Sequence, residues 1–187
     1  SVTNIAPAGF DCDNAGMTYP VMVEVTDDYS NSSTCTATIS VEIGDALPPG
    51  WSADDIGNVG IGNDYAFDPC TSWPNPEDGE FTITGGGNSA VSSTTDNIAF
   101  ASQELCGDGE ILAKVESVTN NGYGGLVARE STMAGAKQVS IFSNLTNILR
   151  HEVRYTTNGP KQVSAFYKPT PIWLKIVRQG NWFFAYY

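Results

Sequence analysis

The sequence predicts an all-β protein, and three observations support this fold class. Apolar and β-branched residues alternate with polar ones over short stretches, as in residues 21–25 and 34–43, which is the period of a strand with one buried face. Glycine (19) and proline (10) are frequent, and turn signals return about every 8 to 12 residues, as in sandwiches and barrels. No stretch of the sequence has the pattern of a long helix. We therefore expect an antiparallel β-sandwich.

The expected strands follow one another with a turn after most of them. The first two form a hairpin around the polar loop 27–32. The stretch 44–50 contains Pro48 and Pro49, and because proline cannot donate to a strand ladder, we expect a linker between two modules there. The remaining strands are expected at residues 81–84, 97–102, 110–118, 125–129, 138–142, 148–156, 162–167, 172–177 and 182–187.

Charge is distributed unevenly along the chain. Residues 1–110 contain 18 acidic residues and no Lys or Arg, whereas residues 111–187 contain all nine basic residues and three acidic ones, which gives −18 and +6. The overall formal charge of −12 argues against a nucleic-acid partner, because binding to phosphates depends largely on Lys and Arg. The acidic block suits an extracellular setting in which divalent cations screen carboxylates. Solubility alone is an equally good explanation.

The four cysteines, Cys12, Cys35, Cys70 and Cys106, are predicted to form disulfides. Their spacing fits no zinc site, since there is no C-x-x-C and only one histidine. An even number of cysteines in a β-rich chain favours an oxidising compartment. Sequence order favours the pairs Cys12–Cys35 and Cys70–Cys106, because each pair then lies within one module. Four free thiols in a cytosolic protein are the alternative.

Several motifs in the second part of the chain occur in a characteristic order: LPPGW (47–51), DIGNVG (55–60), CGDGEI (106–111), GLVARE (125–130), RHEVR (150–154) and WLKIVR (173–178). With these motifs, residues 46–187 resemble a concanavalin A-like lectin/glucanase domain of the kind found in large secreted proteins of Bacteroidetes-type bacteria. The resemblance implies two antiparallel sheets in a jelly roll and an accessory role. It also implies further strands after Tyr187, so the domain is expected to be truncated at its C-terminus.

The first part of the chain, residues 1–45, resembles the C-terminal part of an immunoglobulin-like repeat of the HYR or PKD kind. The similar segments are Phe10-Asp11-Cys12, Val25-Thr26-Asp27 and Asn31–Thr38. A whole immunoglobulin-like repeat needs roughly 80–100 residues. We therefore expect the chain to be part of a larger assembly, with the missing strands supplied by further sequence or by an adjacent chain.

Catalysis is not expected from this sequence. A serine hydrolase needs a base beside its nucleophile, and His151 is the only histidine and no G-x-S-x-G occurs. Glucanases with this sandwich carry an E-x-D-x-x-E pattern, which is absent. Glu110 and Glu116 could share one strand face, but six strand residues span about 20 Å, too far for two carboxylates to cooperate. The chain is predicted not to be an enzyme and to need no cofactor.

A structural calcium ion is a possible exception. Two pairs of carboxylates, Asp27 with Asp28 and Asp54 with Asp55, lie in the hairpin loop and just after the linker. Oxygen ligands of this kind suit Ca²⁺. Solvated turn carboxylates are the alternative interpretation.

A ligand-binding face is predicted on the strand 148–156. Arg150, Glu152 and Arg154 share one face by the period of two, and Arg129, with Lys175 as a further candidate, is expected to lie beside them. Together with the aromatic Tyr123 and Trp73, these groups could hold sugar hydroxyls. A cross-strand ladder of salt bridges is the alternative. Trp51 and Trp173 are expected to be packing residues.

These observations predict a non-catalytic extracellular or cell-surface module of a bacterial protein, acting in adhesion or in carbohydrate binding. Its partners would be a glycan or surface polysaccharide and neighbouring modules, with no nucleic acid and no membrane insertion. A structural spacer or stalk component without a ligand, and an accessory domain of a secreted glycoside hydrolase, are the alternatives.

A strand that ends at Tyr187 would also leave the aromatic residues 182–187 uncovered unless further strands complete the sheet.

Overall fold

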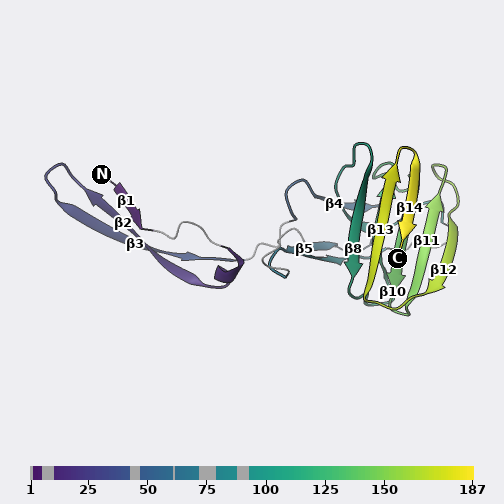
Figure 1. The fold of residues 1–187 in the computed structure, drawn as a ribbon, viewed down its shortest axis with the longest axis horizontal. Helices are drawn as coiled ribbons and strands as arrows, with labels where there is room; N and C mark the ends of the chain where they lie inside the picture. The colour runs from purple at the N-terminus through teal and green to yellow at the C-terminus, as the bar shows by residue number, and fades with distance from the viewer. Residues whose placement is uncertain (1, 6–10, 43–46, 61, 72–78, 88–92) are drawn as a thin grey trace. The chain divides into compact units, whose positions relative to one another are not determined.

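A computed structural model describes residues 2–5, 11–42, 47–60, 62–71, 79–87 and 93–187 of the chain (Figure 1). In these residues every regular element is a β-strand except one three-residue 3₁₀ helix, η1 (Cys12–Asn14). The strand pairs of known register are all antiparallel. The all-β antiparallel prediction is therefore confirmed. No helix of the described residues is long and apolar enough to cross a membrane.

The strands are short and follow one another along the whole chain. Their bounds are β1 (Val2–Ile5), β2 (Thr18–Thr26), β3 (Ser32–Ser40), β4 (Ser52–Ile56), β5 (Asp64–Asp68), β6 (Glu80–Thr84), β7 (Ile98–Ser102), β8 (Gly109–Val115), β9 (Tyr123–Arg129), β10 (Gln138–Asn144), β11 (Ile148–Arg154), β12 (Gln162–Tyr167), β13 (Ile172–Gln179) and β14 (Trp182–Tyr186).

The chain divides into two compact units. The first comprises Ser1–Pro48 and Tyr65–Thr82, and the second comprises Pro49–Asp64 and Ile83–Tyr187. The sequence placed the boundary at residues 45/46 and assigned everything after it to one domain. The structure differs in assigning 65–82 to the first unit, because a disulfide between Cys12 and Cys70 joins this segment to the N-terminal part of the chain.

The first unit contains a three-stranded sheet in the order β1-β2-β3. The apolar residues of β2 at alternate positions lie opposite Cys35, Ala37 and Ile39 of β3, so one face of the sheet is apolar. Of the described residues in this unit, only Val21 is a buried hydrophobic residue. The relation of this sheet to an immunoglobulin-like repeat stays a prediction.

The predicted disulfide pairing is wrong. The structure joins Cys12 to Cys70, with a Cα–Cα distance of 5.4 Å, and leaves Cys35 and Cys106 as exposed free thiols. Cys12 lies in η1, beside the end of the hairpin where Thr18 pairs with Ser40. Cys35 is five residues further along β3, about 17 Å at the rise of a strand. Closeness in sequence was therefore a poor guide to closeness in space.

Removal of the disulfide should destabilise the first unit. The bridge closes a loop with a sequence separation of 58 residues, for which the chain-entropy model gives about 4 kcal/mol. We expect Cys12→Ser to reduce the hydrogen-exchange protection of β2 and β3, measured by mass spectrometry. Cys35→Ser is the matched control, because it removes an exposed free thiol. Equal protection in both variants would contradict the structural role of the bridge.

Two sheets of the second unit pack face to face. One has the order β12-β11-β10-β9 and the other β14-β13-β8, drawn mainly in green to yellow in Figure 1. Leu126, Ile141 and Leu149 of the first sheet form the core with Leu174 and Ile176 of the second. This arrangement is a β-sandwich core, and the jelly-roll connection of the strands stays a prediction. The strand pair β4-β7 also belongs to this unit, and its Ile56 is fully buried.

Candidate functional site

The face of the four-stranded sheet that points away from the core is polar. The register aligns Arg129 of β9 with Gln138 of β10 and Arg154 of β11, and aligns Ser140 with Glu152. Because side chains alternate along a strand, these residues share one face with Arg150, while Leu126, Ile141 and Leu149 face the core. We call the face that carries Arg129, Gln138, Ser140, Arg150, Glu152 and Arg154 the polar face.

Asp96 lies at one end of this polar face, beside Arg129 and Arg154 at the ends of β9 and β11, although it comes from the loop before β7. Its carboxylate is 1% exposed and accepts hydrogen bonds from Arg129 Nη1 at 2.7 Å and from Arg154 Nη1 and Nη2 at 2.6 and 2.9 Å. Lys161 Nζ donates to Oδ1 of the same carboxylate at 3.2 Å. Three cations therefore surround one buried acid.

The network continues from Asp96 to the middle of the sheet. Lys161 Nζ lies 3.0 Å from Glu152 Oε2, and Arg150 forms an ion pair with the same carboxylate. Backbone carbonyls complete the arginine shells: Arg154 donates to Ala136 and Gly159, and Arg129 donates to Met133. The loops that supply these carbonyls close one half of the polar face from solvent.

Opposing effects act on the pKa of Asp96. Burial by itself would raise this pKa, but the hydrogen bonds from Arg154 and Arg129 and the positive charge of Lys161 outweigh it. The pKa of Asp96 is therefore held below its ordinary value. The acid is ionised at neutral pH and acts as the counter-charge of the network.

Most of the predicted ligand-binding residues are consequently unavailable to a ligand. Arg129, Glu152 and Arg154 have side chains that are at most 1% exposed, and their charged groups are paired inside the protein. The alternative, a set of salt bridges across the sheet, describes them better, although the bridges are buried rather than solvent-facing. Lys175 lies on the other sheet, where it pairs with Glu110.

The remaining two predicted residues, Arg150 and Tyr123, meet at the open half of the polar face. The Arg150 guanidinium lies under the Tyr123 ring, 4.5 Å from its centroid. Across the four strands, Arg150 is aligned with Phe142, Gly125 and Ala165, of which Gly125 and Ala165 are exposed and Phe142 is half-buried. The two edge strands of this half therefore face solvent, although Arg150 itself is buried. Trp73, the other predicted aromatic partner, lies outside the described residues.

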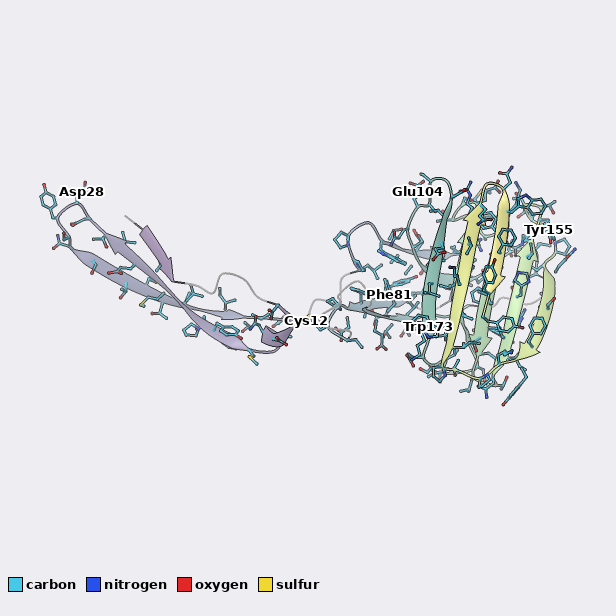
Figure 2. All side chains as sticks on the ribbon, in the orientation of Figure 1. Cys12, Asp28, Phe81, Glu104, Tyr155 and Trp173 are labelled. Carbon is cyan, nitrogen blue, oxygen red and sulfur yellow. A yellow bond between two sulfur atoms is a disulfide. The ribbon has the colours of Figure 1, made fainter. Side chains whose placement is uncertain are left out.

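The four carboxylates considered for calcium do not form a site. Asp27 uses its oxygens inside its own loop, where it accepts hydrogen bonds from the side chain and backbone of Asn31 and from the backbone of Tyr29, and these bonds lower its pKa. Figure 2 shows Asp28 at the tip of the hairpin. Asp54 and Asp55 are neighbours on β4 and so point to opposite faces. Among the described residues, no three His, Cys, Asp or Glu side chains gather as metal ligands.

A second surface lies on the other sheet of the sandwich and combines aromatic with polar side chains. On the side of β8, β13 and β14 away from the core, the register brings Trp182 beside Gln179, Phe184 beside Val177, and Tyr186 beside Lys175. We call this side the outer aromatic face; it carries Glu110, Leu112, Lys114, Trp173, Lys175, Val177, Gln179, Trp182, Phe184 and Tyr186.

The aromatic rings of this outer aromatic face are open to solvent. Trp173 is 57% exposed and Trp182 is 73% exposed, and Phe184 and Tyr186 are also exposed. The expectation that Trp173 is a packing residue is therefore wrong, because Leu174 and Ile176 point to the core and Trp173 takes the other side of β13. The dense run of aromatic residues within 182–187 was the signal in the sequence for this face.

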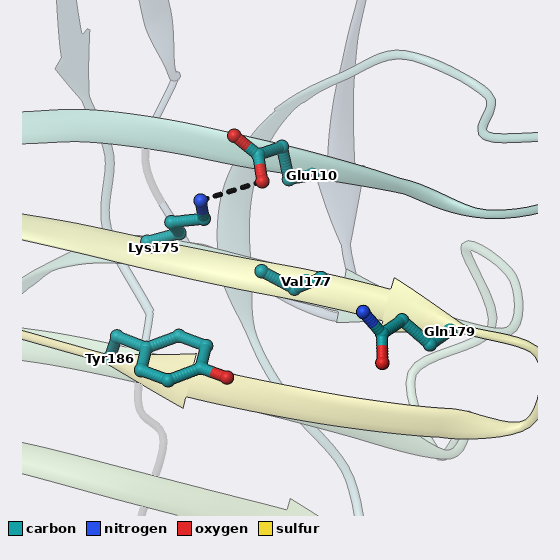
Figure 3. Close-up of a pocket in the computed structure, with 5 residues that line it drawn as sticks. All are labelled: Glu110, Lys175, Val177, Gln179 and Tyr186. Atoms are coloured by element: carbon teal, nitrogen blue, oxygen red, sulfur yellow. Dashed lines mark ion pairs between the residues drawn. The ribbon is translucent and has the colours of Figure 1, made fainter.

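A shallow pocket lies in the middle of the outer aromatic face. It has a volume of about 340 Å³ and is lined by Glu110, Lys175, Val177, Gln179 and Tyr186 (Figure 3). Lys175 Nζ and Glu110 Oε2 form an ion pair of 2.6 Å along its rim. The pocket thus offers a cation, a carboxylate and an amide beside an aromatic ring.

Comparison of the chain with known proteins finds no similar protein. No family model matches the chain, and neither a curated protein nor a solved structure is similar to it at a significant level. Functional inference therefore depends on the residues of the two faces.

Proposed function

We propose that the chain is a non-catalytic extracellular module of a bacterial surface or secreted protein, and that it binds polysaccharide on the outer aromatic face. The observation that carries this proposal is the exposure of Trp173, Trp182, Phe184 and Tyr186 on one face. Large exposed apolar patches of this kind usually mark interaction sites. The Cys12–Cys70 disulfide supports an oxidising, extracellular location.

The composition of the face favours a sugar chain over an apolar protein surface. A sugar ring has a flat C–H side that can lie on an aromatic ring and hydroxyls at its edge that need hydrogen-bond partners. The outer aromatic face offers both, because Lys175, Glu110 and Gln179 line the pocket beside the Tyr186 ring (Figure 3). Binding sites commonly combine aromatic walls with a few polar groups in this way. Four glutamates of the second unit, Glu110, Glu116, Glu130 and Glu152, are engaged in ion pairs, which supports a non-catalytic role.

The experiment is a binding assay on the whole chain with a glycan array and with insoluble polysaccharides. Trp173→Ala combined with Tyr186→Ala should weaken binding at least about tenfold, since exposed aromatic anchors carry a large share of binding energy in many interfaces. Tyr155→Ala is the matched control, because Tyr155 is exposed in the same unit but lies outside the face (Figure 2). Binding that survives the double substitution would place the glycan elsewhere.

Absence of any glycan binding would favour a structural spacer instead. The observation behind this second candidate is the buried network around Asp96, which uses the predicted ligand-binding arginines for stability. A spacer that docks through the outer aromatic face would instead show self-association or capture of a neighbouring module. Light scattering of the unsubstituted chain and of the same double variant distinguishes a spacer from a glycan-binding module, because only self-association of a spacer through this face would be lost on the double substitution.

A further inference from the structure

The lysines of the outer aromatic face are paired with glutamates of the same sheet. Lys175 Nζ lies 2.6 Å from Glu110 Oε2 (Figure 3), and Lys114 Nζ lies 2.5 Å from Oε1 of Glu116, the residue that follows β8. Asp108 adds one more acid at the end of the sheet, where the turn between β13 and β14 donates a backbone hydrogen bond to its carboxylate. Two lysines therefore meet three carboxylates, and each lysine already has an acidic partner.

The arginine of β13 does not add a cation to this face. Because side chains alternate along a strand, Arg178 lies on the side opposite Lys175 and Val177. Its Nε and Nη1 donate to the carbonyls of Gly180 and Leu105 at 3.1 and 3.3 Å. An acidic ligand on the outer aromatic face would thus meet no unpaired cation among the described residues. The overall formal charge of −12 would also repel such a ligand.

The other polar groups of the pocket suit an uncharged ligand. The Gln179 amide both donates and accepts hydrogen bonds, and so does the Tyr186 hydroxyl. Both groups lie beside the Lys175–Glu110 ion pair in Figure 3. Sugar hydroxyls also donate and accept, so they can bond to these groups without separating the ion pair.

The register places one aromatic ring in each of four successive rows of the face. Trp182, Phe184 and Tyr186 occupy alternate positions of β14, and Tyr186 pairs with Lys175 of β13. Trp173 precedes Lys175 by two residues and therefore belongs to the next row. Alternate strand residues are about 7 Å apart, so the four rows span roughly 20 Å along the strands. A single sugar can cover only one of these exposed rings, whereas an extended chain can cover several.

We infer that the ligand of the outer aromatic face is an uncharged, extended polysaccharide that binds through several consecutive sugars along β14 and the start of β13. The inference rests on the proposed function and adds to it the charge and the length of the ligand. The rings contact the C–H sides of the sugars, and Gln179 and the Tyr186 hydroxyl bond to their hydroxyls. The Lys175–Glu110 ion pair disfavours acidic sugars, because a second carboxylate would have to compete with Glu110 for the lysine.

The first test compares neutral and acidic polysaccharides that share a backbone. The pairs are hydroxyethyl cellulose with carboxymethyl cellulose, arabinoxylan with glucuronoxylan, and dextran with dextran sulfate. Biolayer interferometry on the immobilised polymers measures the affinity of the whole chain at constant ionic strength. We expect the neutral member of at least one pair to bind at least about tenfold more tightly than its acidic counterpart, since like charges brought together at an interface are costly.

The outcomes separate this inference from the proposed function. Suppose that an acidic polymer binds as tightly as its neutral counterpart, and that Trp173→Ala with Tyr186→Ala removes this binding. The inference is then overturned, and the proposed function stands. Binding to none of the polymers contradicts the proposed function, and the inference falls with it. Binding that survives the double substitution places the glycan on another surface and overturns both.

Glu110→Gln tests whether the ion pair excludes acidic sugars. The substitution leaves Lys175 without its carboxylate, so the ratio of acidic to neutral affinity should rise up to about fivefold, the most that one exposed ion pair usually contributes. Glu130→Gln is the matched control. It removes the same charge, but from the Glu130–Lys137 pair, which lies outside this face. Equal ratios in the two variants would contradict the role given to the ion pair.

A length series tests the four rows of rings. Isothermal titration calorimetry measures binding of cello-, xylo- or isomalto-oligosaccharides of one, two, four and six sugars, matched to the backbone that binds. We expect the affinity to rise with length, because each added sugar reaches a further part of the row. Trp182→Ala removes the ring at one end and should weaken the six-sugar oligomer at least about threefold more than the two-sugar one, whereas Tyr155→Ala should change neither. Affinity that is independent of length would overturn the extended binding mode.

Discussion

Asp96→Asn is expected to lower the free energy of unfolding of the second unit by about 3–5 kcal/mol, the usual effect of leaving buried charges without their partner. The carboxylate of Asp96 is fully buried and is the acceptor for Arg129, Arg154 and Lys161. Asparagine has almost the same shape but no charge, so the loss is electrostatic rather than steric. Thermal unfolding followed by calorimetry should show a melting temperature lower by about 10 °C or more.

An exposed ion pair on the same unit provides the control. Lys137 Nζ and Glu130 Oε1 are 2.9 Å apart, with both side chains about half exposed. Surface pairs contribute about 0–1 kcal/mol, so Glu130→Gln should change stability little. Similar losses in Asp96→Asn and Glu130→Gln would contradict the central role of Asp96.

The pH dependence of the Asp96→Asn effect identifies its cause. The pKa of Asp96 in the folded protein is lowered, so its stabilising contribution is present above the pKa of about 3.9 of an unfolded aspartate. That contribution is lost as the pH falls through the lower folded-state pKa. The difference in stability between the unsubstituted protein and the Asn variant should therefore be large at pH 7 and shrink in acid below pH ~4. A difference that is independent of pH would point to packing instead of charge.

Local patterns in the sequence were sufficient to predict most of the strands, although β1, β4 and β5 were not among those expected. The alternation within 148–156 predicted both β11 and the common face of Arg150, Glu152 and Arg154, because side-chain direction in a strand follows directly from spacing. The turn at Asn120-Asn121-Gly122 was predictable from the backbone preferences of these residue types. Both asparagines adopt positive φ there, a conformation that Asn tolerates better than most residues.

Long-range partners could not be predicted in the same way. Nothing in the sequence around Asp96 marks it as the counter-charge of two arginines and a lysine that lie 33 to 65 residues later. The indirect signal was the charge distribution: residues 111–187 hold nine cations and three acids. Buried cations in that part therefore needed an acid from the first 110 residues, but the sequence alone does not say which one.

The cysteines illustrate the same limit. Loop closure costs only slightly more for a long loop than for a short one, so proximity in sequence has little power to select a disulfide partner. Cys12 pairs with Cys70 across 58 residues, although Cys35 is closer in sequence. The sheet register decides this, because it fixes Cys35 opposite Val23 in the middle of the hairpin.

Leu174→Ala is expected to destabilise both sheets of the sandwich together. Leu174 is fully buried on β13 and belongs to the same core cluster as Leu126, Ile141 and Leu149 of the facing sheet. Truncation of a buried leucine leaves a cavity and costs about 2–5 kcal/mol. Urea unfolding should show the loss as a lower midpoint with an unchanged slope.

Hydrogen exchange measured along the chain shows whether the two sheets share this core. If they do, Leu174→Ala lowers protection in β10 and β11 as much as in β13, because the opening reaction that exposes one sheet must separate it from the other. Leu145→Ala is the matched control, since Leu145 is exposed in the turn between β10 and β11 and its truncation opens no cavity. Protection lost in β13 alone would mean that β9–β12 fold without the second sheet. The outer aromatic face would then belong to a sheet that opens independently, and its rings would not be held in the fixed arrangement that sugar binding requires.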